Sequence, residues 1–168
     1  LQQQYGLIEG HDRGRLWRVV PRDTKPAKPV DLTKLDLPAL VASLASGNSW
    51  RRETAHRLLV ELDDPQQRVA AGARLRQLAA EASLPETRMR ALVVLESLGG
   101  LEPADLRRAL DDPSYGVRLH ALRLAEPLLD DEVSLRQRVF DGVADPDPNV
   151  RLQVSMTQGE CNDPRVAT

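Results

Sequence analysis

The feature that most constrains this fold is an arginine that recurs along the chain at intervals of 30 to 36 residues. The clearest copies are "DDPSYGVRLHALRLAE" and "DPDPNVRLQVSMTQGE", which share Asp-Pro and Val-Arg-Leu. In each copy the arginine stands three residues before a small or β-branched residue; the pairs are Arg52 and Ala55, Arg88 and Ala91, Arg118 and Ala121, and Arg151 and Val154. A repeat length in this range is typical of stacked supersecondary units.

The pattern around these arginines predicts eight helices that are joined in pairs by short connections. Their expected ranges are 37–46, 50–62, 65–82, 85–98, 103–110, 115–128, 132–143 and 148–158. The connections carry Gly, Pro, Asp or Asn, as helix boundaries commonly do. Asp112 and Asp145, each followed by proline, are predicted N-caps, and Gly99-Gly100 is a predicted helix end.

These pairs predict an all-α fold, a right-handed α-solenoid of about four HEAT-like helix pairs. A two-helix unit cannot bury both of its apolar faces, so stacking the next unit covers them. Ala55, Ala91 and Ala121 let helices approach closely, and neighbouring leucines and valines fill the seam; we assign Leu58, Leu59, Val94, Leu95, Leu122 and Leu124 to it. Trp50, which opens a helix, is expected to pack on the first pair.

The first part of the chain differs from the repeats. Residues 1–20 predict a short N-terminal β-hairpin, because two apolar runs flank the turn "HDRG". Residues 21–36 form a proline-rich linker, and residues 37–168 are the HEAT-like repeat domain. The chain begins at Leu1 and ends on "NDPRVAT", which resembles the start of another helix. We therefore expect a fragment of a longer protein, with any targeting signal outside it.

The recurring arginines have two interpretations. In the structural one, Arg52, Arg88, Arg118 and Arg151 form a ladder with the aspartates that end the preceding turns, namely Asp64, Asp112 and Asp145, or their neighbours Asp63 and Asp111. Charge-assisted contacts between arginine and carboxylate favour this arrangement. In the other, the arginines line a partner surface on the second helices, which we expect on the concave side.

The period and the "DPxxxVR" phrase resemble HEAT repeats. The order of parts is similar to a family of bacterial envelope proteins described as membrane-bound dehydrogenases or haem-binding CxxCH proteins. "GRLWRVVP" resembles the last strand of a sugar-dehydrogenase-like propeller, and "LVASLASGNSWRRETAHRLLVE" resembles the first HEAT unit of that family. "ALVVLESLGGLEPADLRRALDDPSYGVRLHALRLAE" continues the similarity.

This resemblance implies a parent oxidoreductase with haem c and PQQ, located in the periplasm or cell envelope, in which this chain is a non-catalytic scaffold. The implied partners are other proteins or neighbouring domains of the same chain. The chain itself has no CxxCH motif and no recognisable quinone pocket. We therefore expect no catalytic, cofactor-binding or metal-binding residue in it.

The sequence gives little support for a metal site, a disulfide, a membrane span or a nucleic-acid interface. The three histidines, His11, His56 and His120, make no HxxxH or HExxH spacing, and the single cysteine, Cys161, excludes an internal disulfide. No apolar run is long enough to span a membrane. A DNA-binding HEAT-like protein of the alkylpurine glycosylase type is the alternative, but 25 acidic residues outnumber 23 basic ones, which argues against a nucleic-acid partner.

Overall fold

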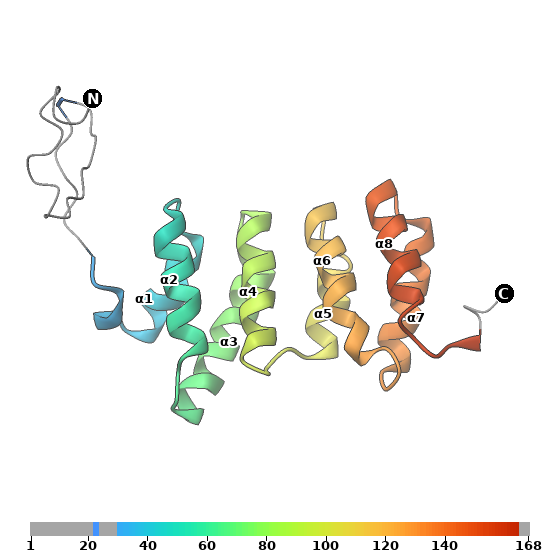
Figure 1. Cartoon of the computed structure of the whole chain (residues 1–168), viewed down its shortest axis with the longest axis horizontal. Helices are drawn as coiled ribbons and strands as arrows, with labels where there is room; N and C mark the ends of the chain where they lie inside the picture. The colour runs from blue at the N-terminus through green and yellow to red at the C-terminus, as the bar shows by residue number, and fades with distance from the viewer. Residues whose placement is uncertain (1–21, 24–29, 165–168) are drawn as a thin grey trace, which may run out of the picture. The chain divides into compact units, whose positions relative to one another are not determined.

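The computed structural model describes residues 22–23 and 30–164, and every regular element in these ranges is helical (Figure 1). The chain divides into two units, Leu1–Val30 and Asp31–Thr168. The predicted hairpin at 1–20 lies outside the described residues. Residues 31–36, which the sequence assigns to the linker, belong to the second unit; Leu32 there is only 2% exposed.

In the part of the second unit that the structure describes, all regular structure is helical, and the eight expected helices are present. They are α1 (Leu37–Ala42), α2 (Ser49–Val60), α3 (Pro65–Glu81), α4 (Pro85–Ser97), α5 (Pro103–Ala109), α6 (Tyr115–Ala125), α7 (Val133–Asp141) and α8 (Pro148–Gln158). Four short 3₁₀ turns accompany them: η1 (Leu32–Lys34), η2 (Ser43–Ala45), η3 (Glu126–Leu128) and η4 (Gly142–Ala144). The last three continue α1, α6 and α7, which explains why the sequence pattern predicts longer helices there.

The helices pack in chain order as four pairs in two layers (Figure 1). Helices α2, α4, α6 and α8 follow one another in one layer, and α1, α3, α5 and α7 follow one another in the second. Because each helix contacts its partner and its counterparts in the adjacent pairs, every pair covers the apolar faces of its neighbours.

Local sequence signals set most of the helix limits. The side chains of Asp36, Asn48, Asp64 and Asp147 accept backbone hydrogen bonds at the starts of α1, α2, α3 and α8. Helix α4 ends in a Schellman motif, as Gly99-Gly100 predicts: Gly99 has φ +68°, and the amides of Gly100 and Gly99 donate to Leu95 and Glu96.

Two predicted N-caps are wrong by two residues. Ser114 and Asp147, not Asp112 and Asp145, occupy the N-cap positions of α6 and α8. Asp112 and Asp145 instead accept a hydrogen bond from the amide two residues later, at 2.8 and 2.9 Å. This Asx turn reverses the chain before the helix begins, so the Asp-Pro signal marks the turn and not the first helical residue.

The core is aliphatic and continuous across the pairs. One buried cluster joins η1 and α1 through α4, another joins α4 through α8, and Ala79 and Leu101 pack against both. Ala55, Ala91 and Ala121 are fully buried, as predicted for the seam, and Val154 is buried with them. Among the predicted seam residues, Leu59, Val94, Leu95 and Leu122 are buried, while Leu58 and Leu124 are half-buried.

Trp50 does not pack on the first pair, contrary to expectation, because its side chain is 61% exposed. The buried residues of α2 are Ala55 and Leu59. At about 3.6 residues per turn, Trp50 lies roughly half a turn around the helix from Leu59. This rotation around the helix axis puts Trp50 on the side of α2 that faces away from the core.

Candidate functional site

Two arginines of the second helices form buried ion pairs between consecutive helix pairs. Arg88 of α4 donates from Nε and Nη2 to the two carboxylate oxygens of Asp112, both at 2.7 Å. Arg118 of α6 donates in the same way to Asp145, at 2.7 and 2.8 Å. All four side chains are between 8% and 12% exposed. These are bidentate pairs, the geometry in which arginine binds a carboxylate most specifically.

The carboxylate comes from the following helix pair, whereas the ladder expected from the sequence used the preceding turn. The preceding turn contributes its carbonyl oxygens instead: Arg118 Nη1 donates to the carbonyls of Asp112 and Pro113, at 2.8 and 3.2 Å. Each arginine thus spans two turns, holding the backbone of its own turn and the side chain of the next. The physical reason is that stacking brings the next turn level with the start of the helix.

The ion pairs shift the ionisation of their partners. The hydrogen bond to Asp145 raises the pKa of Arg118, and the hydrogen bond from Arg118 lowers the pKa of Asp145. The hydrogen bond to Asp112 likewise raises the pKa of Arg88. Burial alone raises the pKa of Asp112, but the hydrogen bonds from Arg88 and the Ser114 amide outweigh it, so that this pKa is lowered overall. Both carboxylates are therefore held ionised.

The other predicted site residues stand outside these two pairs. Arg52 donates to the Ser46 carbonyl at 2.8 Å, and Arg151 donates to the carbonyls of Asp145 and Pro146. Asp64 caps α3 by accepting from the Gln66 amide at 2.8 Å and forms neither ion pair. The exposed Arg151 has no carboxylate within ion-pair distance in the described ranges.

The first helices carry further links that the recurring arginine does not predict. Arg76 of α3 donates to the Gly100 carbonyl at 2.6 Å and to Asp105 at 3.0 Å, and it pairs with Glu102. Asp105 also accepts from the Glu102 amide, which completes a capping box at the start of α5. The sequence "EPAD" at a helix start is a signal for the capping box. No feature of the sequence indicates that Arg76, 26 residues before Glu102, is the donor that joins it.

A second link in the first layer joins α7 to the end of α5. Arg138 donates to Asp111 at 2.6 Å and to the Leu110 carbonyl at 2.9 Å. Asp111 is 68% exposed, so this contact is screened by water more than the two bidentate pairs. Arginine therefore links the second, third and fourth helix pairs in both layers.

A polar cluster lies where α6 and η3 meet α8, and its Gln153 and Thr157 are buried. Gln153 accepts from Arg123 at 2.9 Å and donates to Thr157 and Glu126 at 3.2 and 3.3 Å. Thr157 also donates to Glu126 at 2.8 Å. Each of the four side chains has a hydrogen-bond partner inside the cluster. The cluster is therefore a polar contact between packed helices whose hydrogen bonds are satisfied internally.

Other reactive groups are dispersed. Burial lowers the pKa of His120, with a smaller contribution from Arg123. Cys161 is buried, and its thiol contacts the Gln158 carbonyl. Across residues 22–23 and 30–164, no group of three or more His, Cys, Asp or Glu residues could hold a metal ion. No helix in these same ranges is both long and apolar enough to cross a membrane.

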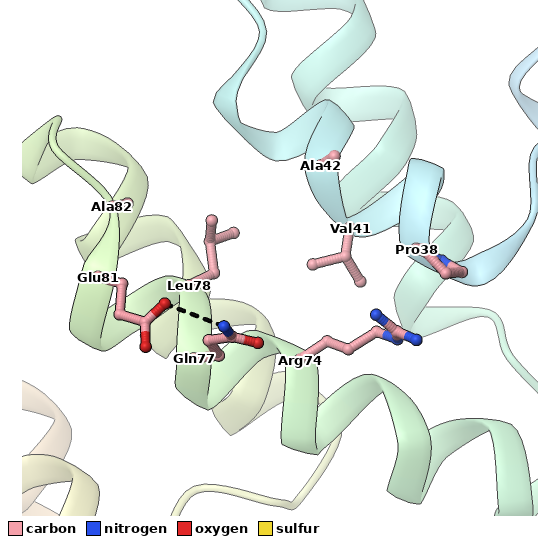
Figure 2. Close-up of a pocket in the computed structure, with 8 residues that line it drawn as sticks. All are labelled: Pro38, Val41, Ala42, Arg74, Gln77, Leu78, Glu81 and Ala82. Carbon is pink, nitrogen blue, oxygen red and sulfur yellow. Dashed lines mark hydrogen bonds between the residues drawn. The ribbon is translucent and has the colours of Figure 1, made fainter.

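A shallow hollow of about 300 Å³ lies between α1 and α3 (Figure 2). Val41 and Leu78 lie within it, and Arg74 and Glu81 stand toward opposite ends. Glu81 accepts a hydrogen bond from Gln77 at 2.9 Å. The arrangement is an aliphatic groove with separated charges, and it brings together no acid, base and nucleophile of the kind that catalysis needs.

Comparison with known proteins adds no assignment: a scan of protein-family models finds no match to this chain, and a search of curated protein sequences finds none either.

Proposed function

We propose that the helical unit is a right-handed, HEAT-like α-solenoid that serves as a non-catalytic scaffold or interaction module. The observation that carries this proposal is the use of arginine between helix pairs. Arg88 and Arg118 of the second helices form ion pairs with Asp112 and Asp145 of the next helix pair. These ion pairs join consecutive helix pairs, and we infer that they keep the stack in register.

We further propose that this scaffold belongs to a larger bacterial envelope dehydrogenase with c-type haem and PQQ. The support is the resemblance of "GRLWRVVP", the linker and the first repeats to that family. In that setting the stack separates a propeller from a cytochrome domain in the periplasm, and its second helices, on the concave side, face a partner.

One surface of the last pair supports a partner beyond α8. Leu152 is 63% exposed and Met156 is 59% exposed on this helix. By the repeat, Leu152 aligns with Leu119 of α6, which is half-buried against the core. A neighbouring domain or protein on α8 would remove this apolar surface from water, as packing does within the stack.

The test of the parent assignment uses the full-length gene product, purified from its own envelope fraction. We expect a c-type visible absorption spectrum and a haem stain that survives a denaturing gel, because c-type haem is attached covalently. Absence of covalent haem from that product would contradict the oxidoreductase assignment. It would leave the scaffold proposal to be judged on this chain alone.

The DNA-binding alternative loses two of the four recurring arginines of the second helices as phosphate contacts. Arg88 and Arg118 are about one-tenth exposed and already paired, so they offer no contact to phosphate. Binding of a DNA duplex at low salt, weakening steeply as salt rises, would support the alternative instead. No binding at low salt would remove it.

A further inference from the structure

The residue six positions before each recurring arginine has the same backbone role in all four helix pairs. In each pair its carbonyl oxygen accepts a hydrogen bond from the arginine Nη1 at 2.7 or 2.8 Å; these residues are Ser46, Ala82, Asp112 and Asp145. The backbone angles agree where they are compared: φ and ψ are −61° and 139° at Ser46, −61° and 133° at Ala82, and −58° and 138° at Asp145.

The side chain at this position decides whether an ion pair forms. Asp112 and Asp145 send their carboxylates to the arginine of the preceding pair. Ala82 stands at the equivalent position before α4 and has only a methyl group. The carboxylate that would face Arg52 of α2 is therefore missing, although the backbone that would present it is in place.

Arg52 consequently lacks the carboxylate partner that Arg88 and Arg118 have. Arg52 donates a hydrogen bond to the Ser46 carbonyl, and no carboxylate of residues 22–23 or 30–164 lies within ion-pair distance of it. Its side chain lines a pocket of about 340 Å³ between the first two pairs, together with Ser46, Leu84, Glu86, Thr87 and Arg90.

The charges around this pocket favour a single negative group. Arg52 and Arg90 both line it, against one acid, Glu86. The ion pair of Arg90 is long, 3.6 Å to Glu53, and Glu53 is 64% exposed, so it cancels little of that cation. Glu86 disfavours a doubly charged phosphate, while a carboxylate is the group that the equivalent arginines bind elsewhere in this stack.

We propose that this pocket binds an aspartate or glutamate side chain of a protein partner, which supplies from outside the carboxylate that Ala82 lacks. Leu84 lines the pocket and is 55% exposed, so a peptide gains an apolar contact there that a simple anion does not. The inference rests on the proposed interaction role and names the chemistry that the partner must bring. It is tested on this chain, so its failure leaves the haem test of the parent protein unaffected.

The test is a titration of the isotopically labelled chain, followed by nuclear magnetic resonance at constant ionic strength. The probes are a blocked Gly-Leu-Asp-Leu-Gly peptide, the same peptide with asparagine in place of aspartate, and sodium acetate. We expect the aspartate peptide to shift the Arg52 Nε–H and Leu84 amide signals. We expect the asparagine peptide to bind about tenfold more weakly, because a hydrogen bond between two charged groups is stronger than one to a neutral amide.

Three variants locate the effect. Arg52→Gln removes the cation, and Ala82→Asp places a carboxylate on the protein itself; both are expected to abolish binding of the aspartate peptide. Ala82→Asp is also expected to raise the melting temperature, which separates a filled pocket from a damaged fold. The matched control is Arg57→Gln, on the same helix but in an exposed pair with Glu61, and it is expected to bind normally.

Several results would overturn the proposal. Equal binding of the aspartate and asparagine peptides would mean that the carboxylate is not recognised. Unchanged binding in Arg52→Gln or in Ala82→Asp would place the peptide elsewhere. If acetate shifts the same signals with the affinity of the peptide, the pocket is a site for a free carboxylate and not for a protein side chain.

Discussion

Replacing Arg118 by alanine tests how much one link between helix pairs contributes to stability. The substitution removes two hydrogen bonds to Asp145, at 2.7 and 2.8 Å, and leaves that carboxylate about one-tenth exposed without its cation. It also removes the contacts to the carbonyls of Asp112 and Pro113. The loss therefore affects two consecutive turns of the stack at once.

The magnitude follows from the burial of the pair. Removing one partner of a buried ion pair costs about 3–5 kcal/mol. The Asp147 amide still donates to Asp145 at 2.9 Å, and the Asp145 side chain is 10% exposed, so we expect the lower end of that range, about 3 kcal/mol. For a domain of this size, 1 kcal/mol shifts the melting temperature by about 2–4 °C, which predicts a fall of about 6–12 °C.

The assay is thermal and urea unfolding followed by far-ultraviolet circular dichroism. Arg57→Ala is the matched control, because Arg57 and Glu61 form an exposed pair within one helix turn, and it is expected to cost less than about 0.5 kcal/mol. Asp145→Ala and the double variant complete a cycle whose coupling energy we expect at about 1–3 kcal/mol. An Arg118→Ala melt that matches the Arg57→Ala melt, or a coupling energy near zero, would refute the structural role.

Two further changes test the packing and the charge of the stack. Gly142→Ala is expected to destabilise the chain by about 1 kcal/mol in a urea titration, because a Cβ there would lie 2.7 Å from Cγ2 of the buried Val154. The control is Gly47→Ala, whose added Cβ meets nothing within 4 Å. An equal effect of the two substitutions would contradict the predicted clash. The lowered pKa values of Asp112 and Asp145 mean that their stabilisation is complete above the unfolded-state value of about 3.9 and is lost as the pH falls through the folded-state values. The melting temperature should therefore drop steeply below about pH 4, and Asp145→Asn should reduce that drop; an unchanged acid profile in this variant would argue against the assignment.

Much of the fold could be predicted because its signals are local. The 3.6-residue periodicity, the proline and aspartate residues at helix starts and Gly99-Gly100 at a helix end are properties of short segments, and the eight helices follow them closely. Trp50 shows the limit of such signals: its place near a helix start was evident, but the side of the helix on which it lies depends on which residues face the core.

The candidate site could be predicted only in part. The arginines and two of the aspartates were visible as a repeated phrase, but the direction of the ion pairs was not, because each pair joins residues 24 or 27 positions apart. Once that geometry is known, the sequence becomes informative again. Alanine at position 82, six residues before Arg88, is the departure from the repeat that leaves Arg52 without a carboxylate.

By itself the sequence determined that this chain forms paired helices with small residues at their seams, since helix periodicity and capping depend on neighbours a few residues away. Only the tertiary structure decided which aspartate each arginine reaches, that Asp64 caps a helix, and that a pocket opens beside Arg52. These depend on how one pair stacks on the next, and stacking places turns that are distant in the sequence at contact distance.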